Sequence, residues 1–265
     1  MKIILFCKRV IALAIIVGAL PFVNNASAYA QERKYLDDYS QPIGLTYGAQ
    51  AKVQAAYLWR GLYCGGLNTQ MSANVGYGGL YFDMWWNIGV TDWTFRTFEP
   101  EVDLTLGFAR WGLDVYLLYI HNFNCGFFDF GNYPDKGNRL ELDVRYTVSS
   151  KLPLSFLWAT RIGAADGYVV GNDTVFAWSS YAEISYTQKL RDGFSIYGAI
   201  GVTPWRSVYT LYQRDFALQN IELRLRKDWT IAERCGLMLQ GQLCVNPSAV
   251  TKSILTNITL GVYLR

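Results

Sequence analysis

The sequence is poor in the residues that metal and catalytic sites need. His121 is the one histidine in 265 residues, and the five cysteines form no C-x-x-C pair. Structural zinc sites use four Cys or His ligands at short spacings, so none is expected. No serine nucleophile or orienting acid stands near His121 at a recognisable spacing, and the glycine-rich stretch GLYCGG lacks the P-loop pattern. We therefore expect no enzyme activity, no catalytic or metal-binding residues and no cofactor.

After its first thirty residues the sequence also lacks any apolar run long enough for a membrane helix. That N-terminal segment has Lys2, Lys8 and Arg9, then the fourteen-residue run VIALAIIVGALPFV, then the small residues ASAYAQ. A membrane helix needs about 20 apolar residues, whereas this pattern is typical of a cleaved secretory signal. We expect residues 1–30 to be a signal peptide cleaved near Ala28 or Ala30, and residues 31–265 to be one exported domain.

An excess of charge of one sign is missing as well. The formal net charge is +3, and the three basic residues of the signal segment, which contains no acid, account for all of it. The exported chain is balanced, so we expect no nucleic-acid partner.

The stretch PEVDLTLGFARWGLDVYLLYI, residues 100–120, shows what is present instead. Apolar residues occupy every second position from Val102 to Phe108, with Glu101 and Asp103 among the residues between them. This period of two predicts a strand, the Trp111-Gly112 pair interrupts it, and a second alternating run follows. Each run has about nine or ten residues, against about five or six for a usual strand. With aromatic residues at 16% of the chain, this pattern favours strands that cross a membrane in a β-barrel.

Similar segments recur to the end of the chain and predict an all-β fold, a transmembrane antiparallel up-and-down β-barrel of 12 strands. The predicted strands are 47–60, 68–77, 80–88, 101–109, 113–121, 138–148, 153–163, 175–187, 193–203, 217–228, 236–245 and 253–264. Short and long links alternate, as periplasmic turns and extracellular loops do in outer-membrane barrels. The expected extracellular links are 61–67, 89–100, 122–137, 164–174, 204–216 and 246–252.

The alternation sorts the strand residues onto two faces. Lipid-facing candidates carry no charge: Val53, Ala55, Tyr57, every second residue from Val102 to Phe108 (Val102, Leu104, Leu106 and Phe108), Leu140, Leu142, Val144, Tyr146, Leu154, Phe156, Trp158, Ile221, Leu223, Leu225, Ile258, Leu260 and Val262. The residues between them face the other side of each strand and include the charged ones. These charged residues are the pore-lining candidates: Lys52, Asp83, Glu101, Asp103, Asp114, Arg139, Glu141, Asp143, Arg145, Arg161, Glu183, Glu222, Arg224 and Arg226. Among these, Arg224 and Arg226 with Arg139 and Arg145 are candidates for one basic wall opposite Glu101 and Asp103.

The first hairpin, AAYLWRGLYCGGLNTQMSANVGYGGLYFDMWWNIG, resembles the opening of the TorF-type family of outer-membrane porins. The shared features are an aromatic-x-aromatic-Arg-Gly pattern (Tyr57, Trp59, Arg60, Gly61), then Gly78-Gly79 before the aromatic strand Tyr81 to Trp86. The likeness is clearest over residues 45–121 and implies a barrel with a transport role. The C-terminal TLGVYLR partly keeps the pattern that the barrel assembly machinery recognises, although it does not end on an aromatic residue.

Cys64 and Cys125 both fall in expected extracellular links, so a disulfide between them is possible, with Cys244 as a competing partner for either. Cys235 and Cys244 lie about 30 Å apart on one strand and cannot pair with each other.

The expected function is a narrow, porin-like outer-membrane channel for passive passage of small hydrophilic solutes, with outer-membrane lipids around it. A filled barrel that acts as a structural or adhesion scaffold through its extracellular loops is the alternative, because twelve strands enclose far less space than a sixteen-stranded porin. An exported soluble β-sandwich is a third possibility, since alternation requires only one buried face.

Overall fold

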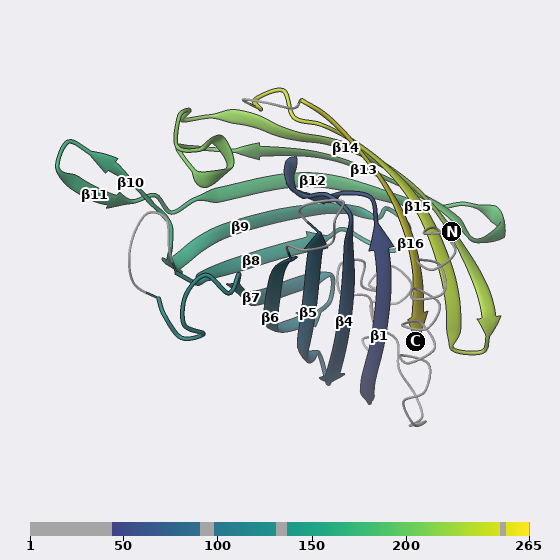
Figure 1. The fold of residues 1–265 in the computed structure, drawn as a ribbon. Helices are drawn as coiled ribbons and strands as arrows, with labels where there is room; N and C mark the ends of the chain where they lie inside the picture. The colour runs from purple at the N-terminus through teal and green to yellow at the C-terminus, as the bar shows by residue number, and fades with distance from the viewer. Residues whose placement is uncertain (1–43, 91–97, 131–136, 250–252, 265) are drawn as a thin grey trace, which may run out of the picture.

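The structure, a computed structural model, describes residues 44–90, 98–130, 137–249 and 253–264. Within these ranges twelve strands form one closed antiparallel barrel (Figure 1), and around the wall they follow the order β1-β16-β15-β14-β13-β12-β9-β8-β7-β6-β5-β4. Their bounds are β1 Leu45–Gln54, β4 Asn68–Tyr77, β5 Leu80–Val90, β6 Phe98–Arg110, β7 Leu113–His121, β8 Arg139–Thr147, β9 Leu154–Ala164, β12 Ser180–Lys189, β13 Phe194–Thr203, β14 Ala217–Ala232, β15 Cys235–Val245 and β16 Ile254–Leu264. The predicted fold class is confirmed.

The barrel closes where β1 pairs with β16, in a register that runs from Ala49 opposite Leu264 to Gln54 opposite Thr259. No helix in the described part of the chain is long and apolar enough to cross a bilayer. The expected signal peptide, residues 1–30, lies outside the described residues. So do parts of the expected links 89–100, 122–137 and 246–252.

Two-residue turns join several strand pairs at one end of the barrel. The β6–β7 turn has Trp111 at φ 54° and Gly112 at φ 81°, the backbone that a type I′ turn requires. A Cβ on Gly112 would lie 2.4 Å from the carbonyl oxygen of Thr147, so the neighbouring chain also requires glycine there. Gly78 and Gly79 make the corresponding turn between β4 and β5. These turns lie where the alternation of the sequence is interrupted.

The two faces of the wall differ in polarity as the alternation predicts. Along β16 exposed and buried residues alternate, with Ile258 at 65% exposure between the buried Asn257 and Thr259. On β6, Leu106 is 60% exposed on the outside. An apolar outer surface and a polar interior are the arrangement that a transmembrane barrel needs, because a charged side chain in the lipid costs about 2 to 4 kcal/mol.

The structure corrects the predicted strand 47–60. The wall strand β1 ends at Gln54, because the N–H of Ala56 donates to Oδ1 of Asn257, at 3.0 Å, instead of continuing the backbone ladder. The chain then forms a separate small hairpin, β2 (Tyr57–Trp59) and β3 (Leu62–Gly65). Part of the expected extracellular link 61–67 therefore belongs to this hairpin.

The predicted strand 175–187 also begins later, at Ser180 in β12. Residues up to Phe176 belong instead to a two-stranded sheet, β10 (Gly167–Val170) with β11 (Asp173–Phe176), which projects away from the barrel body (Figure 1). Two single-turn 3-10 helices complete the fold, η1 (Arg191–Gly193) and η2 (Val208–Thr210).

Candidate functional site

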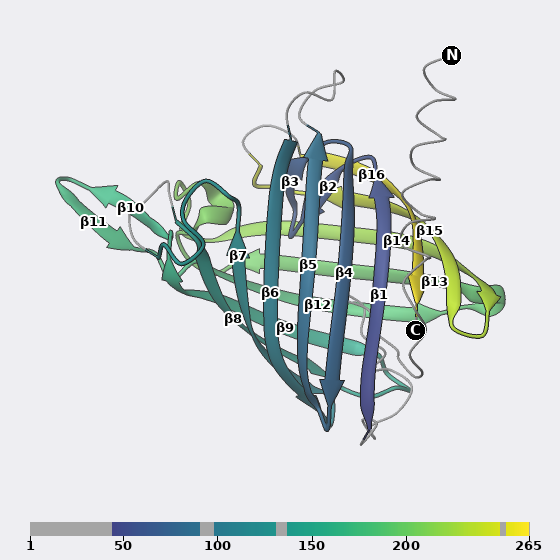
Figure 2. The same ribbon diagram turned by 60° about the horizontal axis from the view of Figure 1, so that its bottom comes forward.

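The β2–β3 hairpin enters the lumen and crosses it. It leaves the wall between β1 and β4, whereas its side chains Trp59 and Leu62 pack against a buried cluster that includes Leu157 of β9 and Tyr181 of β12. In the strand order β9 stands six strands from β1, on the opposite side of the barrel. Figure 2 shows β2 and β3 behind the β4–β6 wall. The hairpin is therefore a bridge across the bore.

Gly61 lets the turn of this bridge pack against β14, which stands three strands from β1 in the barrel. The turn residues Arg60 and Gly61 have φ of 49° and 80°, again a type I′ backbone. A Cβ on Gly61 would lie 2.0 Å from the carbonyl oxygen of Gln219, near the start of β14. The carbonyl of Gly61 accepts a hydrogen bond from Nδ2 of Asn246, at 2.9 Å. The tip is thus held through its backbone, and a side chain at Gly61 would push it off the wall.

Arg60 fixes the tip through its side chain. Its Nη1 lies 2.8 Å from Oε1 of Glu141, its Nη2 lies 2.9 Å from Oδ2 of Asp143, and Nη1 donates to the hydroxyl of Tyr209 at 2.5 Å. The guanidinium also lies over the rings of Trp59 and Tyr181, 4.6 Å and 5.1 Å from their centroids. Burial alone would lower the pKa of Arg60, but the charges of Glu141 and Asp143 raise it above its usual value.

The base of the hairpin is held by the near wall. The hydroxyl of Tyr57 donates to Oε1 of Glu101, at 2.8 Å, and its ring lies 5.5 Å from that of Trp85 on β5. The second carboxylate oxygen of Glu101 accepts from Asn122, which in turn accepts from Arg139. Tyr57 was expected to face lipid on a continuous strand, and this assignment is wrong because the chain leaves the wall before it.

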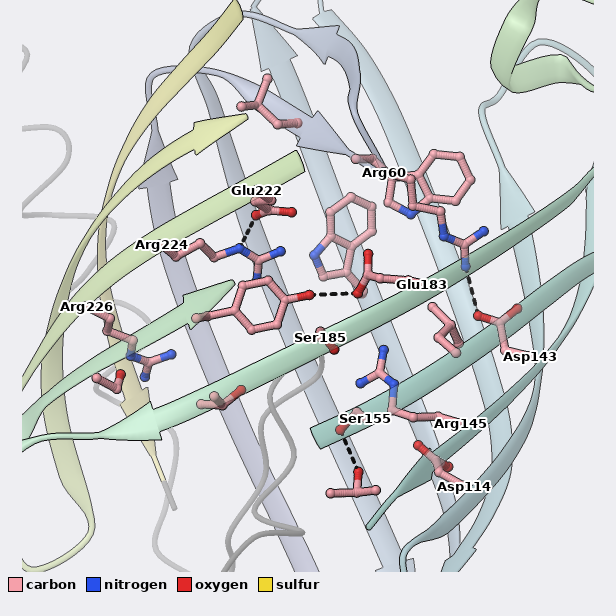
Figure 3. A pocket seen from close by; sticks show the side chains of 18 of the residues that line it. Arg60, Asp114, Asp143, Arg145, Ser155, Glu183, Ser185, Glu222, Arg224 and Arg226 are labelled. Carbon is pink, nitrogen blue, oxygen red and sulfur yellow. Dashed lines mark hydrogen bonds and ion pairs between the residues drawn. The ribbon is translucent and has the colours of Figure 1, made fainter. Parts of the chain in front are cut away.

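A cavity of about 540 Å³ extends from the hairpin towards the turns at the opposite end of the barrel, where Gly193 and Thr230 border it. Nine of the fourteen pore-lining candidates line this cavity: Asp83, Asp103, Asp114, Asp143, Arg145, Glu183, Glu222, Arg224 and Arg226. All of these except Asp83 and Asp103 are labelled in Figure 3. The space is thus polar and charged and lies inside a closed wall, as an aqueous route requires.

The other five candidates lie outside the lining of this cavity. Glu141 and Glu101 hold the two ends of the hairpin, and Arg139 is bonded to Asn122. Lys52 stands opposite the buried Gln70, and Arg161 is buried, with its Nη1 3.4 Å from the carbonyl of Ala165. Whether any of the fourteen contacts a permeating solute stays a prediction.

Sequence reasoning missed several residues that line the cavity, and Arg60 is the most important. It also missed Lys189 and Asp228, near strand ends, and the lumen tyrosines Tyr116 and Tyr197. A signal for Arg60 was present, because an Arg-Gly pair between two short aromatic runs is compatible with a two-residue hairpin turn.

Most charges of the cavity wall have partners in the same wall. On β14, Arg224 pairs with Glu222, and Arg226 makes two contacts of 2.9 Å with Asp228. The carboxylate of Glu183 accepts from the hydroxyls of Tyr181, at 2.5 Å, and of Tyr197, at 2.7 Å. These contacts hold the side chains against the wall and leave space in the middle of the bore.

The proposed basic wall is only partly correct. Arg224 and Arg226 are on β14, and Glu101 and Asp103 are on β6. The two strands stand six apart in the barrel, so the two arginines do face the two acids across the lumen. Arg139 and Arg145 are on β8, two strands from β6, where Arg145 stands beside Asp114 of β7. The four arginines therefore do not share a wall.

The cysteines and the histidine take no part in the cavity lining. Cys64 and Cys125 are free thiols in the structure, and their pairing stays a prediction. His121 is buried at the end of β7, with its Nδ1 2.5 Å from Oδ1 of Asn138. Among the described residues, no three His, Cys, Asp or Glu side chains are grouped to hold a metal ion.

No family model and no curated protein matches the chain. Solved structures that resemble it include an outer membrane channel from Pseudomonas putida F1, at 10% identity and a TM-score of 0.48 over 86% of this chain and 98% of that one. The NanC porin is 11% identical, with a TM-score of 0.46 over 83% of this chain and 100% of that one. OmpT of Vibrio cholerae is 9% identical, with a TM-score of 0.33 over 85% of this chain and 98% of that one. These likenesses are too distant to assign a function, and the resemblance to TorF-type porins stays a prediction. The strand pairing itself carries the fold assignment.

Proposed function

We propose that this protein is an outer-membrane barrel that forms a narrow, porin-like channel for passive passage of small hydrophilic solutes. The observation that carries the proposal is the charged cavity of about 540 Å³ inside the closed barrel. A barrel that served only as a scaffold has no need of a hollow charged interior. The bridging hairpin makes the channel narrow, because it occupies one level of the bore from β1 to β9.

The location follows from the outer surface. Exposed Leu, Ile, Val and aromatic side chains cover the outside of the strands, while charged side chains line the inside. We propose that outer-membrane lipids surround this surface after export, cleavage of the signal near Ala28 or Ala30, and insertion by the barrel assembly machinery. The closed barrel overturns the third possibility, an exported β-sandwich. Fractionation with an alkaline wash tests the location, because an exported protein that is not embedded in lipid would be removed from the membrane by the wash.

The second candidate function is a filled barrel that displays its extracellular loops. The hairpin favours it, since a bridge fixed at both ends could block the bore completely.

Liposome swelling separates the two functions. Vesicles that contain the purified protein should swell in glycerol and small sugars and stop swelling as the solute grows. Absence of swelling for every solute, from a barrel shown to be folded by heat-dependent gel migration, would favour the scaffold.

A further inference from the structure

The guanidinium of Arg60 is bound in the lumen as a ligand would be. Arg60 belongs to the hairpin tip, whereas both of its carboxylate partners belong to β8 and its hydroxyl partner, Tyr209, to η2. Two rings of the same pocket, those of Tyr181 and Tyr209, lie 5.1 Å and 5.9 Å from the guanidinium carbon. We call the four wall residues Glu141, Asp143, Tyr181 and Tyr209 the guanidinium cage.

The cage residues are rigidly placed within the protein. Glu141, Asp143 and Tyr181 are each 0% exposed, and Tyr209 is 3% exposed. Tyr209 also lies 3.3 Å from Oε2 of Glu141, and the ring of Tyr181 packs against that of Tyr209 at 5.6 Å between centroids. The cage is therefore a preformed set of buried acceptors and aromatic faces.

The chemistry of the cage is specific for a planar cation. Two carboxylates in different directions match the fork of N–H donors on a guanidinium, and aromatic faces bind the delocalised charge. A compact ammonium reaches fewer of these partners at once. Arg60 and Asp143 also line the main cavity, so the cage borders the lumen on the side of Asp143.

The hairpin holds Arg60 in the cage at a conformational cost. A non-glycine residue at φ 49° is in the left-handed region, which side chains disfavour. A free guanidinium solute does not have this backbone strain, but it loses translational freedom on binding, which Arg60 does not because it is attached to the chain. The solute therefore takes over the cage only at high concentration.

We propose that the guanidinium cage is a binding site for guanidinium-bearing solutes, which Arg60 fills in their absence and which they take over as they enter the lumen. Displacing Arg60 removes the side-chain anchor of the hairpin tip and leaves the backbone contact of Gly61 with Asn246 to hold it. The tip is then free to shift, which widens the bore. The transport part of this inference rests on the proposed channel function, whereas the binding part does not.

The binding part is tested with Arg60→Ala protein purified from membranes. Millimolar methylguanidinium chloride should raise its thermal unfolding midpoint saturably, while urea, a neutral planar analogue, and sodium chloride at the same concentrations should not. The triple variant Arg60→Ala, Glu141→Gln, Asp143→Asn is the matched control and should lose the response. An Arg60→Ala barrel that folds but responds no more to methylguanidinium than to sodium chloride would overturn the proposal.

The transport part is tested with the wild-type protein in a planar bilayer. This test remains decisive if the Arg60→Ala variant does not fold. Agmatine should raise the conductance saturably, and putrescine, a diamine without the guanidinium, should have at least fivefold less effect at equal concentration. Equal effects of the two amines on an open channel would overturn the proposal. If the wild type is silent, the proposed channel function fails, and the methylguanidinium response alone decides whether the cage binds its ligand.

Discussion

Arg60 and Asp143 are 83 residues apart in the sequence, yet Nη2 of Arg60 lies 2.9 Å from Oδ2 of Asp143. This pair joins the tip of a hairpin that starts beside β1 to the wall strand β8 on the other side of the bore. The ion pairs of Arg60 with Glu141 and Asp143, together with the backbone contact of Gly61, therefore hold the hairpin across the lumen.

Replacing Arg60 with Ala is expected to release the hairpin and increase single-channel conductance. Removing one partner of a buried ion pair leaves uncompensated carboxylates, at a cost of about 3–5 kcal/mol. Urea unfolding of the purified barrel measures this loss, and planar-bilayer recording measures the conductance. Arg206→Ala is the control, because its pair with Asp215 is solvent-exposed, at 41% and 79% for the two side chains, and is expected to contribute about 0–1 kcal/mol. Similar losses for the two variants would show that the Arg60 pair does not hold the bridge.

Gly61→Ala, like Arg60→Ala, is expected to release the hairpin and to increase the single-channel conductance. The new Cβ would meet the carbonyl oxygen of Gln219 at 2.0 Å, so the tip has to move away from β14. Gly171→Ala is a matched control, since Gly171 also has positive φ, 64°, in a two-residue turn but has nothing within 4 Å of the added Cβ. Both variants carry a left-handed backbone cost of about 1–2 kcal/mol. Trypsin cleavage after Arg60 reports the release, and equal protection in both variants would contradict the docked position of Gly61.

Neighbouring residues on β12 test the assignment of the two faces. Ile184 is half-exposed on the outside of the barrel, and Ser185 lines the cavity. Ile184→Arg should destabilise the barrel by about 2 to 4 kcal/mol because it places a charge in lipid, whereas Ser185→Arg points into the polar lumen and should cost far less. Urea unfolding in lipid vesicles measures both. The reverse order of stabilities would require the two faces of the strand to be exchanged.

The charges of β14 are expected to influence ion selectivity. The double change Arg224→Glu and Arg226→Glu leaves Glu222 and Asp228 without their cations and makes this wall strongly acidic. The reversal potential in a salt gradient should shift towards cation preference. Lys227→Glu is the control, because Lys227 pairs in register with Leu239 on the outer face of β15. If the double variant conducts with an unchanged reversal potential, Arg224 and Arg226 do not act on the permeating ions.

Twelve wall strands could be predicted from the sequence because each alternates for long enough to show a period of two. The alternation also placed charged residues such as Asp103 and Glu222 on the inner face, and the Trp111-Gly112 turn interrupts it clearly. What alternation cannot show is where a strand leaves the wall. Tyr57 and Trp59 continue the odd-numbered apolar positions of Val53, so the period runs on although the backbone turns into the lumen.

Contacts that form only when the barrel closes also could not be predicted from the sequence. The cage around Arg60 combines residues from β8, β12 and η2, which are far apart in the sequence and meet only because the sheet closes on itself. Arg139 and Arg145 were placed in the wrong wall for the same reason. The alternation of residues identifies the inner face of a strand but not the position of that strand around the barrel.

The bridge across the bore can be tested most directly by removing it. Gln54 and Asn68 are paired neighbours on β1 and β4, so a short Gly-Ser turn can replace residues 57–65 without straining the wall. Single-channel recording of both proteins in the same bilayer should give small discrete steps for the wild type and steps at least twofold larger for the shortened chain. Equal steps, or silence from two folded barrels, would contradict a conducting lumen whose width is set by the hairpin.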